Sequence, residues 1–216
     1  MSKMLLTACV LAATLFLPQT VGAQTSSPSR FSLGVEGGAQ AVQNVGGLLG
    51  AQLSGSVSSR FDVFGEAVYL QDVVTRRRAE SATDVATYLA QTQGKAATGT
   101  LEIPTWAFTG GGKVFLADFG HTRLYAAGQA GAAHVTLSPT FTLGGADITS
   151  TLPQYGVTLG ADLTGSSVCA VVGGGIGVLA NHGHWYFDAA FRVLSIQMET
   201  QPAHALTIAV GFGRNF

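Results

Sequence analysis

Strict alternation of apolar and polar residues is the feature of this sequence that most limits the folds it can adopt. The last twelve residues, ALTIAVGFGRNF (205–216), show it most clearly. One face of this stretch is large and apolar, and it consists of Leu206, Ile208, Val210, Phe212 and Phe216, interrupted by Arg214. The other face is small or polar. A period of two residues predicts a β-strand, because successive side chains of a strand point to opposite faces.

The same alternation predicts eight strands along the chain. We expect them at 31–42, 47–58, 61–74, 101–116, 122–137, 166–180, 185–198 and 204–216. Each segment is long enough for a tilted membrane strand of ~9–11 residues. The connections at 59–60, 117–121 and 181–184 are short, whereas those at 75–100 and 138–165 are long. Short turns on one side and variable loops on the other are typical of an outer-membrane barrel.

The first residues predict export and a single following domain. Residues 1–23 begin with a basic Lys3, continue with an apolar run and end in Val-Gly-Ala, which is the pattern of a cleaved signal peptide. The apolar run is shorter than the roughly 20 residues that span a bilayer as a helix. We therefore expect a signal peptide at 1–23, a short lead at 24–30 and a β-barrel domain at 31–216.

Composition narrows the class of protein further. Charged residues make up 11% of the chain against about 25% in a typical soluble domain, and 29 residues are glycine. The net charge of -1 gives no electrostatic reason to expect nucleic-acid binding. Mean hydropathy is positive at +0.34, yet no segment after the signal has the length of a membrane helix. These values leave two architectures, a glycine-rich β-sandwich or a β-barrel whose outer face meets lipid.

The alternation alone does not tell which face of the strands points inward, so the loops and the aromatic residues have to decide. If the short turns lie on one side of a membrane, one group of aromatic residues falls near that interface and another near the opposite one. The first group comprises Phe31, Trp185, Phe187, Phe212 and Phe216, and the second comprises Tyr69 and Trp106. Two aromatic girdles around an aliphatic band are expected for a membrane barrel.

Three stretches resemble a known family: FSLGVEGGAQAV (31–42), SRFDVFGEAVYL (59–70) and IAVGFGRNF (208–216). Together with the signal, they make the chain similar to small eight-stranded outer-membrane barrels of the OmpA transmembrane-domain and OmpX type, within the porin-like outer-membrane β-barrel proteins. The resemblance implies an all-β, eight-stranded, antiparallel, transmembrane up-and-down barrel in the outer membrane of a Gram-negative-type bacterium. It also implies that Phe216 and Phe212 form a signal for the barrel-assembly machinery. Because the sequence ends with the barrel, we expect no peptidoglycan-binding domain.

Charged residues on the faces opposite the apolar ones predict a network inside the barrel. It consists of Glu36, Asp62, Glu66, Lys113, Arg123, Asp188 and Arg192. The interior of an eight-stranded barrel is only wide enough for side chains, so buried charges have to pair. Measured from the short turns, Glu66 and Lys113 lie at similar depth and are expected to pair, and Asp62 and Arg123 both lie low. The network is interpreted as a structural plug, with an ion-lined channel as the alternative.

The two long connections carry further candidate features. Residues 75–95 place Arg76, Arg77 and Arg78 at the rim, followed by a short amphipathic helix. Arginine clusters bind phosphates well, so these residues are candidates for contact with lipopolysaccharide, the alternative being a solvated loop base. In the other connection, TLGGADIT (142–149) is echoed by TLGADLT (158–164). This repeat predicts a hairpin that extends beyond the membrane.

Taken together, these features predict an integral outer-membrane protein with a structural or surface-interaction role. We expect a monomer in contact with outer-membrane lipid and lipopolysaccharide, with no cofactor and no enzymatic activity. The first alternative is a narrow porin-type channel for small solutes. The second is a barrel-borne lipid-modifying enzyme, for which His134 and Thr136 would form a His–hydroxyl dyad.

Overall fold

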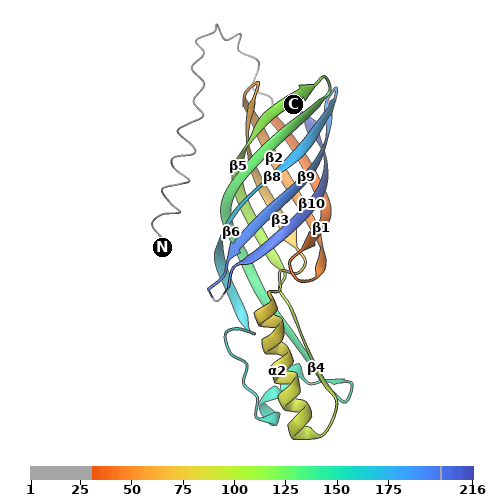
Figure 1. Cartoon of the computed structure of the whole chain (residues 1–216), viewed down its shortest axis with the longest axis vertical. Coiled ribbons are helices and arrows are strands. Elements are labelled where there is room, and N and C mark those ends of the chain that lie inside the picture. The colour runs from red at the N-terminus through yellow and green to blue at the C-terminus, as the bar shows by residue number, and fades with distance from the viewer. Residues whose placement is uncertain (1–30, 200) are drawn as a thin grey trace.

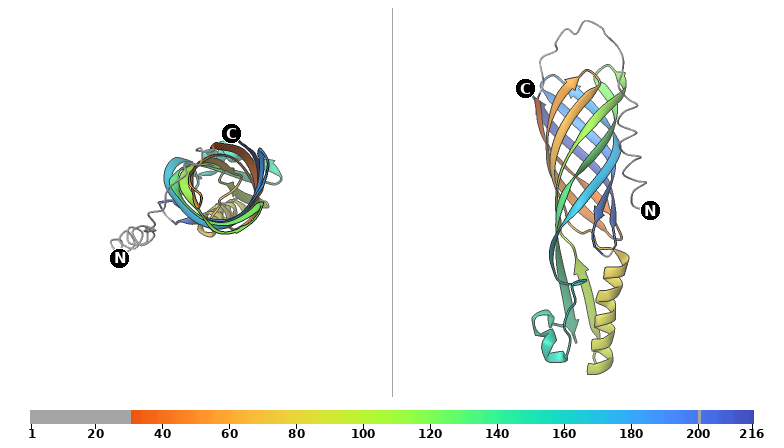
Figure 2. Two further views of the ribbon diagram at one scale, coloured as in Figure 1. Left: turned by 90° about the horizontal axis from the view of Figure 1, so that it is seen from above. Right: turned by 90° about the vertical axis from the view of Figure 1, so that its left-hand side faces the viewer.

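The strands of the chain close into a barrel that carries a smaller unit at one end (Figure 1). The computed structural model describes residues 31–199 and 201–216. The expected signal peptide at 1–23 and lead at 24–30 therefore lie outside the described residues. Viewed along its axis, the barrel is a closed ring (Figure 2).

Within residues 31–199 and 201–216, eight antiparallel strands form the ring, each paired with its neighbours. They are β1 (Phe31–Ala41), β2 (Val45–Ser58), β3 (Phe61–Leu70), β5 (Thr105–Phe119), β6 (Thr122–Leu143), β8 (Gly165–His182), β9 (Trp185–Gln197) and β10 (Ala203–Asn215). The first and last strands close the ring, with Ser32 opposite Asn215 and Ala41 opposite Leu206. Closure leaves none of these eight strands with a free edge inside the ring. The predicted fold class is confirmed.

The barrel is apolar outside and polar inside. Large apolar side chains on the outward positions are well exposed, for example Leu49 at 64% and Val210 at 60%. The inward positions bury polar and charged residues instead: Glu36, Gln40, Gln52, Asp62, Glu66, Thr105, Thr109, Lys113, Gln129, Asp188, Arg192 and Thr207. A water-soluble sandwich has the reverse arrangement, with its apolar faces inward. The question that the alternation left open is therefore decided in favour of a barrel.

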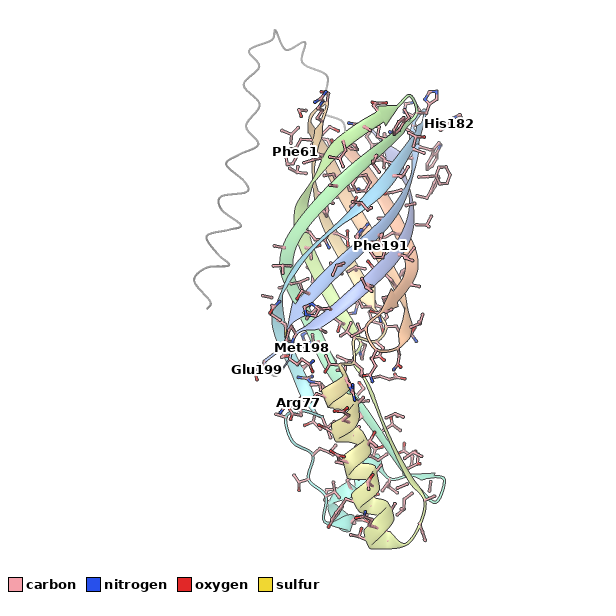
Figure 3. All side chains as sticks on the ribbon, in the orientation of Figure 1. Phe61, Arg77, His182, Phe191, Met198 and Glu199 are labelled. Atoms are coloured by element: carbon pink, nitrogen blue, oxygen red, sulfur yellow. The ribbon has the colours of Figure 1, made fainter. Side chains whose placement is uncertain are left out.

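One end of the barrel carries three tight turns, and we call it the short-turn end. The turns connect β2 to β3, β5 to β6 and β8 to β9. Gly120 and Gly183 adopt positive φ in two of them (77° and 62°), a conformation that glycine reaches without steric cost. Side chains such as Phe61 and His182 lie at this end, whereas Met198 and Glu199 lie at the other (Figure 3).

The smaller unit, which we call the loop unit, comprises residues 71–104 and 138–164. It contains α2 (Arg76–Gln93), β4 (Ala97–Glu102), the end of β6, β7 (Ala146–Asp147) and the 3-10 helix η1 (Thr149–Tyr155). The end of β6 continues past the barrel and pairs with β4 on one side and β7 on the other. Helix α2 ends at Gly94, which is left-handed and whose N–H bonds to the carbonyl of Ala90.

Several element boundaries differ from the sequence-based expectation. The strand expected at 101–116 is divided into β4 and β5 at Pro104, because proline lacks the N–H that a ladder needs. The helix expected to be short has 18 residues. The repeat does not form one hairpin from its two copies. The first copy alone turns at Gly144–Gly145 between β6 and β7, and the long partner of the β6 extension is β4.

A continuous apolar core joins the barrel to the loop unit. It begins inside the barrel at Leu70, Val135 and Ile196, and it continues into the loop unit with Leu89 and Phe141, all fully buried. The two parts therefore share one core. Among the described residues, the helices are too short or too polar to cross a membrane.

Candidate functional site: the charged lumen and the loop unit

The centre of the lumen holds an arginine bound by two carboxylates. Arg192 on β9 donates from Nη1 to Glu66 Oε2 at 2.8 Å and to Glu36 Oε1 at 3.1 Å, and from Nη2 to Glu36 Oε2 at 2.6 Å. The three side chains are each less than one-tenth exposed. Bidentate bonds from a planar guanidinium are among the stronger ion-pair geometries. These bonds cross the lumen from β9 to β1 and β3.

A lysine forms the second part of the network. Lys113 on β5 donates to Asp188 Oδ2 at 2.8 Å and to Gln52 Oε1 at 2.7 Å. The hydroxyl of Tyr125 donates to the other oxygen of Asp188 at 2.6 Å. Gln52 in turn donates to Glu66 Oε2 at 3.1 Å, which links the lysine group to the arginine group. The lumen is thus filled at this level by one hydrogen-bonded network.

The expected pairing of Glu66 with Lys113 is wrong. In the β3–β5 ladder, Glu66 lies opposite Thr109 and Lys113 lies opposite Asp62, so the two residues are at different heights. Counting from the turns misses this difference because neighbouring strands of a barrel are staggered by its shear. Each residue finds its partner on β9 instead, Glu66 on Arg192 and Lys113 on Asp188.

Asp62 and Arg123 stand apart from this network. Asp62 is buried, yet its Oδ1 has no hydrogen-bond partner among the described residues. Arg123 lies at the mouth of the lumen, where it donates to the carbonyl of Ser59 and stacks 3.3 Å above the Phe115 ring. Its nearest carboxylate is Asp118, 4.0 Å away and largely exposed. Arg123 is therefore a rim residue and not part of the buried network.

The prediction also missed neutral members of the network. Gln52 connects the two ionic groups, and Tyr125 holds Asp188 in place. Gln52 lies on the polar face of a clearly alternating strand, so its inward position could have been found. Tyr125 lies in a stretch dominated by glycine and alanine, where the two faces cannot be told apart by hydropathy.

Beyond the network, the lumen is closed by apolar residues. Leu70, Ile103, Val135 and Ile196 are 0% exposed at the end of the barrel that faces the loop unit. They belong to the core that continues between α2, β4 and β6. The lumen therefore contains a charged layer followed by an apolar layer on the side of the loop unit.

Aromatic residues gather at opposite ends of the outer surface. At the short-turn end, the ring of Phe212 stacks on Trp185 at 4.8 Å and contacts Phe187 at 5.1 Å. The N–H of Phe216 donates to the carbonyl of Phe31 at 2.8 Å, and its exposed ring lies 5.4 Å from the Arg214 guanidinium. At the other end, the rings of Tyr69 and Trp106 lie 5.2 Å apart. These are the positions expected of two girdles.

The three arginines of the first helical turn have different environments. Arg76 is exposed and bonds to Glu80 at 2.7 Å, and Arg77 is exposed near the barrel rim (Figure 3). Arg78 is buried, with 7% of the residue exposed, which disfavours its expected contact with lipopolysaccharide. The helix has no side-chain cap and no acidic residue in this turn. The candidate lipid contact is thus reduced to Arg76 and Arg77.

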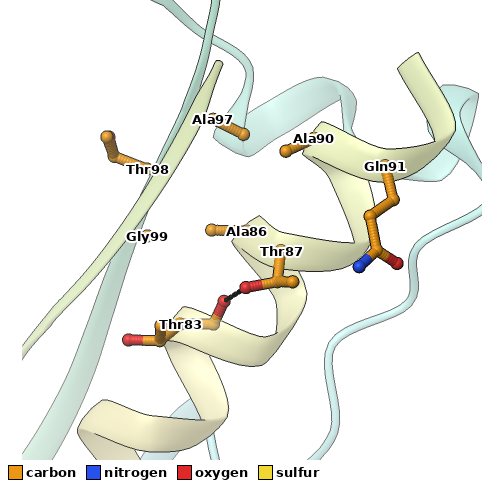
Figure 4. A pocket seen from close by; sticks show the side chains of 8 residues that line it. All are labelled: Thr83, Ala86, Thr87, Ala90, Gln91, Ala97, Thr98 and Gly99. Atoms are coloured by element: carbon orange, nitrogen blue, oxygen red, sulfur yellow. Dashed lines mark hydrogen bonds between the residues drawn. The ribbon is translucent and has the colours of Figure 1, made fainter. Parts of the chain in front are cut away.

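The loop unit also contains an open groove between α2 and β4, with a volume of ≈570 Å³ (Figure 4). Apart from Gln91, its lining consists of small residues, with Ala86 and Ala90 on the helix and Gly99 on the strand. Gly99 permits this close approach, since a Cβ there would collide with the carbonyl of Ala82. Elsewhere in the loop unit, Asp147 accepts bonds from the N–H and hydroxyl of Thr149, which lowers the pKa of its carboxyl.

The geometry defines a class of protein before any comparison: a closed eight-stranded barrel with an apolar exterior and a filled lumen. No protein-family model and no curated protein matches the sequence. Among solved structures, the chain is similar to Neisserial surface protein A, with a TM-score of 0.54 and 8% identity over 89% of this chain and 100% of that one. It is also similar to a major outer membrane protein from Thermus thermophilus, with a TM-score of 0.50 and 10% identity over 88% and 100%. At these identities the likeness concerns the fold alone, which is that of small outer-membrane β-barrels.

Proposed function

We propose that the protein is an integral outer-membrane barrel with a sealed lumen, whose role is to present the loop unit as an interaction surface. The observation that carries this proposal is the double closure of the lumen. The Arg192 and Lys113 groups fill its centre, and the apolar layer around Leu70 closes it toward the loop unit. A solute would have to displace both layers.

The membrane location rests on the exterior of the barrel. An apolar band of exposed large side chains, such as Leu49, Phe108 and Val210, extends over seven of the eight ring strands, and β6 adds small outward residues. Soluble monomers rarely expose contiguous apolar patches larger than a few hundred Å². Lipid is the solvent that suits such a band, and the aromatic clusters at its two ends suit the lipid–water interfaces. Cell fractionation tests this location. Recovery of the protein in the soluble periplasmic extract would contradict it.

Lipid phosphates are the partners we propose for the rim of the loop unit. Arg76 and Arg77 are exposed in the first turn of α2, beside the end of the apolar band. Their charge adds to the positive end of the helix dipole. Glu80, one turn further along the helix, pairs with Arg76, whereas Arg77 has no salt-bridge partner among the described residues. The phosphates of lipopolysaccharide would supply the missing negative charge. The barrel-assembly machinery is a second proposed partner, through the exposed aromatic Phe216.

Conductance separates this proposal from a narrow channel. The refolded protein in a planar bilayer is expected to leave the conductance near that of the bare bilayer, whereas a porin inserted under the same conditions serves as the positive control. A large, steady conductance of the wild-type protein would overturn the sealed lumen. No second function is favoured by a specific observation, since His134 lies on the outward face of β6.

A further inference from the structure

A second cavity opens at the short-turn end of the barrel, on the far side of the ion network from the loop unit. Its volume is ≈310 Å³, and every one of the eight barrel strands contributes to its lining. Most of the lining is polar, including the hydroxyls of Ser32, Ser54 and Ser56 and the amides of Asn181 and Asn215. Asp62 lies in its wall together with Lys113.

Asp62 is the unexplained group in this cavity. The residue is 8% exposed and its Oδ1 is buried without a hydrogen-bond partner among the described residues. Both nearby cations are engaged elsewhere. Lys113, its neighbour across the β3–β5 ladder, donates to Asp188 and Gln52. Arg123 donates to the carbonyl of Ser59 and stacks on Phe115.

The balance of buried charge in the lumen gives an independent argument. Among the described residues, the buried charges of the barrel are four carboxylates and two cations, namely Glu36, Asp62, Glu66 and Asp188 against Lys113 and Arg192. The excess is therefore two negative charges. Glu36 and Glu66 share one arginine, and Asp188 takes the lysine. Asp62 is left without a cation, although a buried charge needs one.

We propose that this cavity binds a small monovalent cation on the carboxylate of Asp62. One carboxylate together with neutral serine and asparagine oxygens suits an alkali ion or a protonated primary amine. Divalent ions require several carboxylates or more ligands, and the described residues contain no cluster of three His, Cys, Asp or Glu side chains that could hold a metal. The hydroxyls of Ser32 and Ser54 lie 2.6 Å apart at this mouth and retain free lone pairs.

Cation-dependent stability of the refolded protein in zwitterionic micelles tests this proposal. The urea midpoint is measured while sodium or methylammonium chloride replaces N-methyl-D-glucamine chloride at constant ionic strength. A ligand that binds only the folded state at ten times its Kd raises the folded-to-unfolded ratio about elevenfold. The wild-type midpoint is therefore expected to rise with at least one of the two small cations. A rise with sodium alone identifies an inorganic ion, and a rise with methylammonium alone identifies an amine.

Two variants with the same change of charge localise the effect. Asp62→Asn is expected to abolish the cation-dependent rise, whereas Asp118→Asn is expected to retain it, because Asp118 lies at the same mouth but is largely exposed. A wild-type midpoint that does not depend on the cation would overturn the proposal. An equal response of both variants would overturn it as well. Neither result bears on the sealed lumen, which the conductance measurement tests separately.

Discussion

Glycine residues on the inward face determine where large side chains fit in the lumen. Gly177 on β8 faces Tyr125, and a Cβ at this position would collide with the tyrosine ring. The same ring carries the hydroxyl that bonds to Asp188. The glycine on one strand therefore makes room for the tyrosine that orders the ion network from the next strand.

Substitution of Gly177 tests this dependence. Gly177→Ala is expected to lower the free energy of unfolding by ~1–3 kcal/mol, because overpacking forces side chains out of their rotamers. Gly128→Ala is the matched control, since a Cβ there meets nothing within 4 Å, and its effect is expected within ~0.5 kcal/mol. Urea unfolding in detergent measures both. Equal losses would show that Tyr125 can move aside.

The pairing of Lys113 with Asp188 is tested by a double-mutant cycle. Lys113→Met and Asp188→Asn should each cost ~3–5 kcal/mol, because each leaves a buried partner uncompensated. The double variant should recover part of that loss. In a control cycle, Arg123→Met and Asp188→Asn should add within ~0.5 kcal/mol, because these residues share no partner. Urea unfolding gives all the values, and an additive Lys113–Asp188 cycle would contradict the assigned pair.

At the scale of single residues, the sequence predicts which side chains point into the lumen, but it does not predict which of them contact one another there. The inward positions of Glu36, Glu66 and Arg192 follow from the period of two in their strands. Their contacts depend on the stagger between strands and on which side chains cross the lumen. Neither of these is encoded by the alternation within one strand.

The elements of the loop unit depend on packing that only the folded chain provides. Helix α2 buries Ala82, Ala86 and Leu89 against β4 and β6, and β4 is a strand only because the end of β6 lies beside it. The barrel strands, in contrast, are long and most of them alternate clearly, so their positions could be predicted, although β6 ends six residues later than expected, at Leu143. Strand β4 has only six residues, two threonines and one glycine among them, so it lacks the long, clear apolar–polar alternation that would predict a strand.

Leu89 tests whether the loop unit can unfold separately from the barrel. Leu89→Ala removes a side chain that is 0% exposed, and it is expected to destabilise the loop unit by ~2–5 kcal/mol. Tyr88→Ala, at the neighbouring position and 47% exposed, should have a much smaller effect. Limited proteolysis should cleave the Leu89 variant within residues 71–104 while its barrel remains resistant to SDS without heating. Loss of this resistance would mean that the shared core makes the two parts unfold together.

At the scale of the whole molecule, the closed ring accounts for both the exterior and the lumen. Eight strands satisfy all the inter-strand hydrogen bonds of the ring and leave space for side chains only. This architecture could be predicted because most strands alternate clearly, as β1, β9 and β10 do, and because the connections differ in length between the two ends. The apolar seal toward the loop unit could not be predicted from the sequence. Its residues come from segments that are far apart in the sequence, and they are apolar although the rest of the lumen is polar.

The last prediction concerns insertion of the whole barrel into the membrane, and it tests the role of Phe216, whose N–H bonds to Phe31 at the start of β1. Phe216 and Phe187 both belong to the exposed aromatic residues of the short-turn end, at 68% and 53% exposure. If Phe216 serves only as an interfacial aromatic, the two alanine substitutions should have similar effects, since each removes one ring from the same interface. If it also serves as a recognition signal for assembly, Phe216→Ala should reduce the membrane-inserted protein several-fold more than Phe187→Ala. The measurement is the fraction of heat-modifiable protein in outer membranes, and equal fractions for the two variants would remove the assembly role.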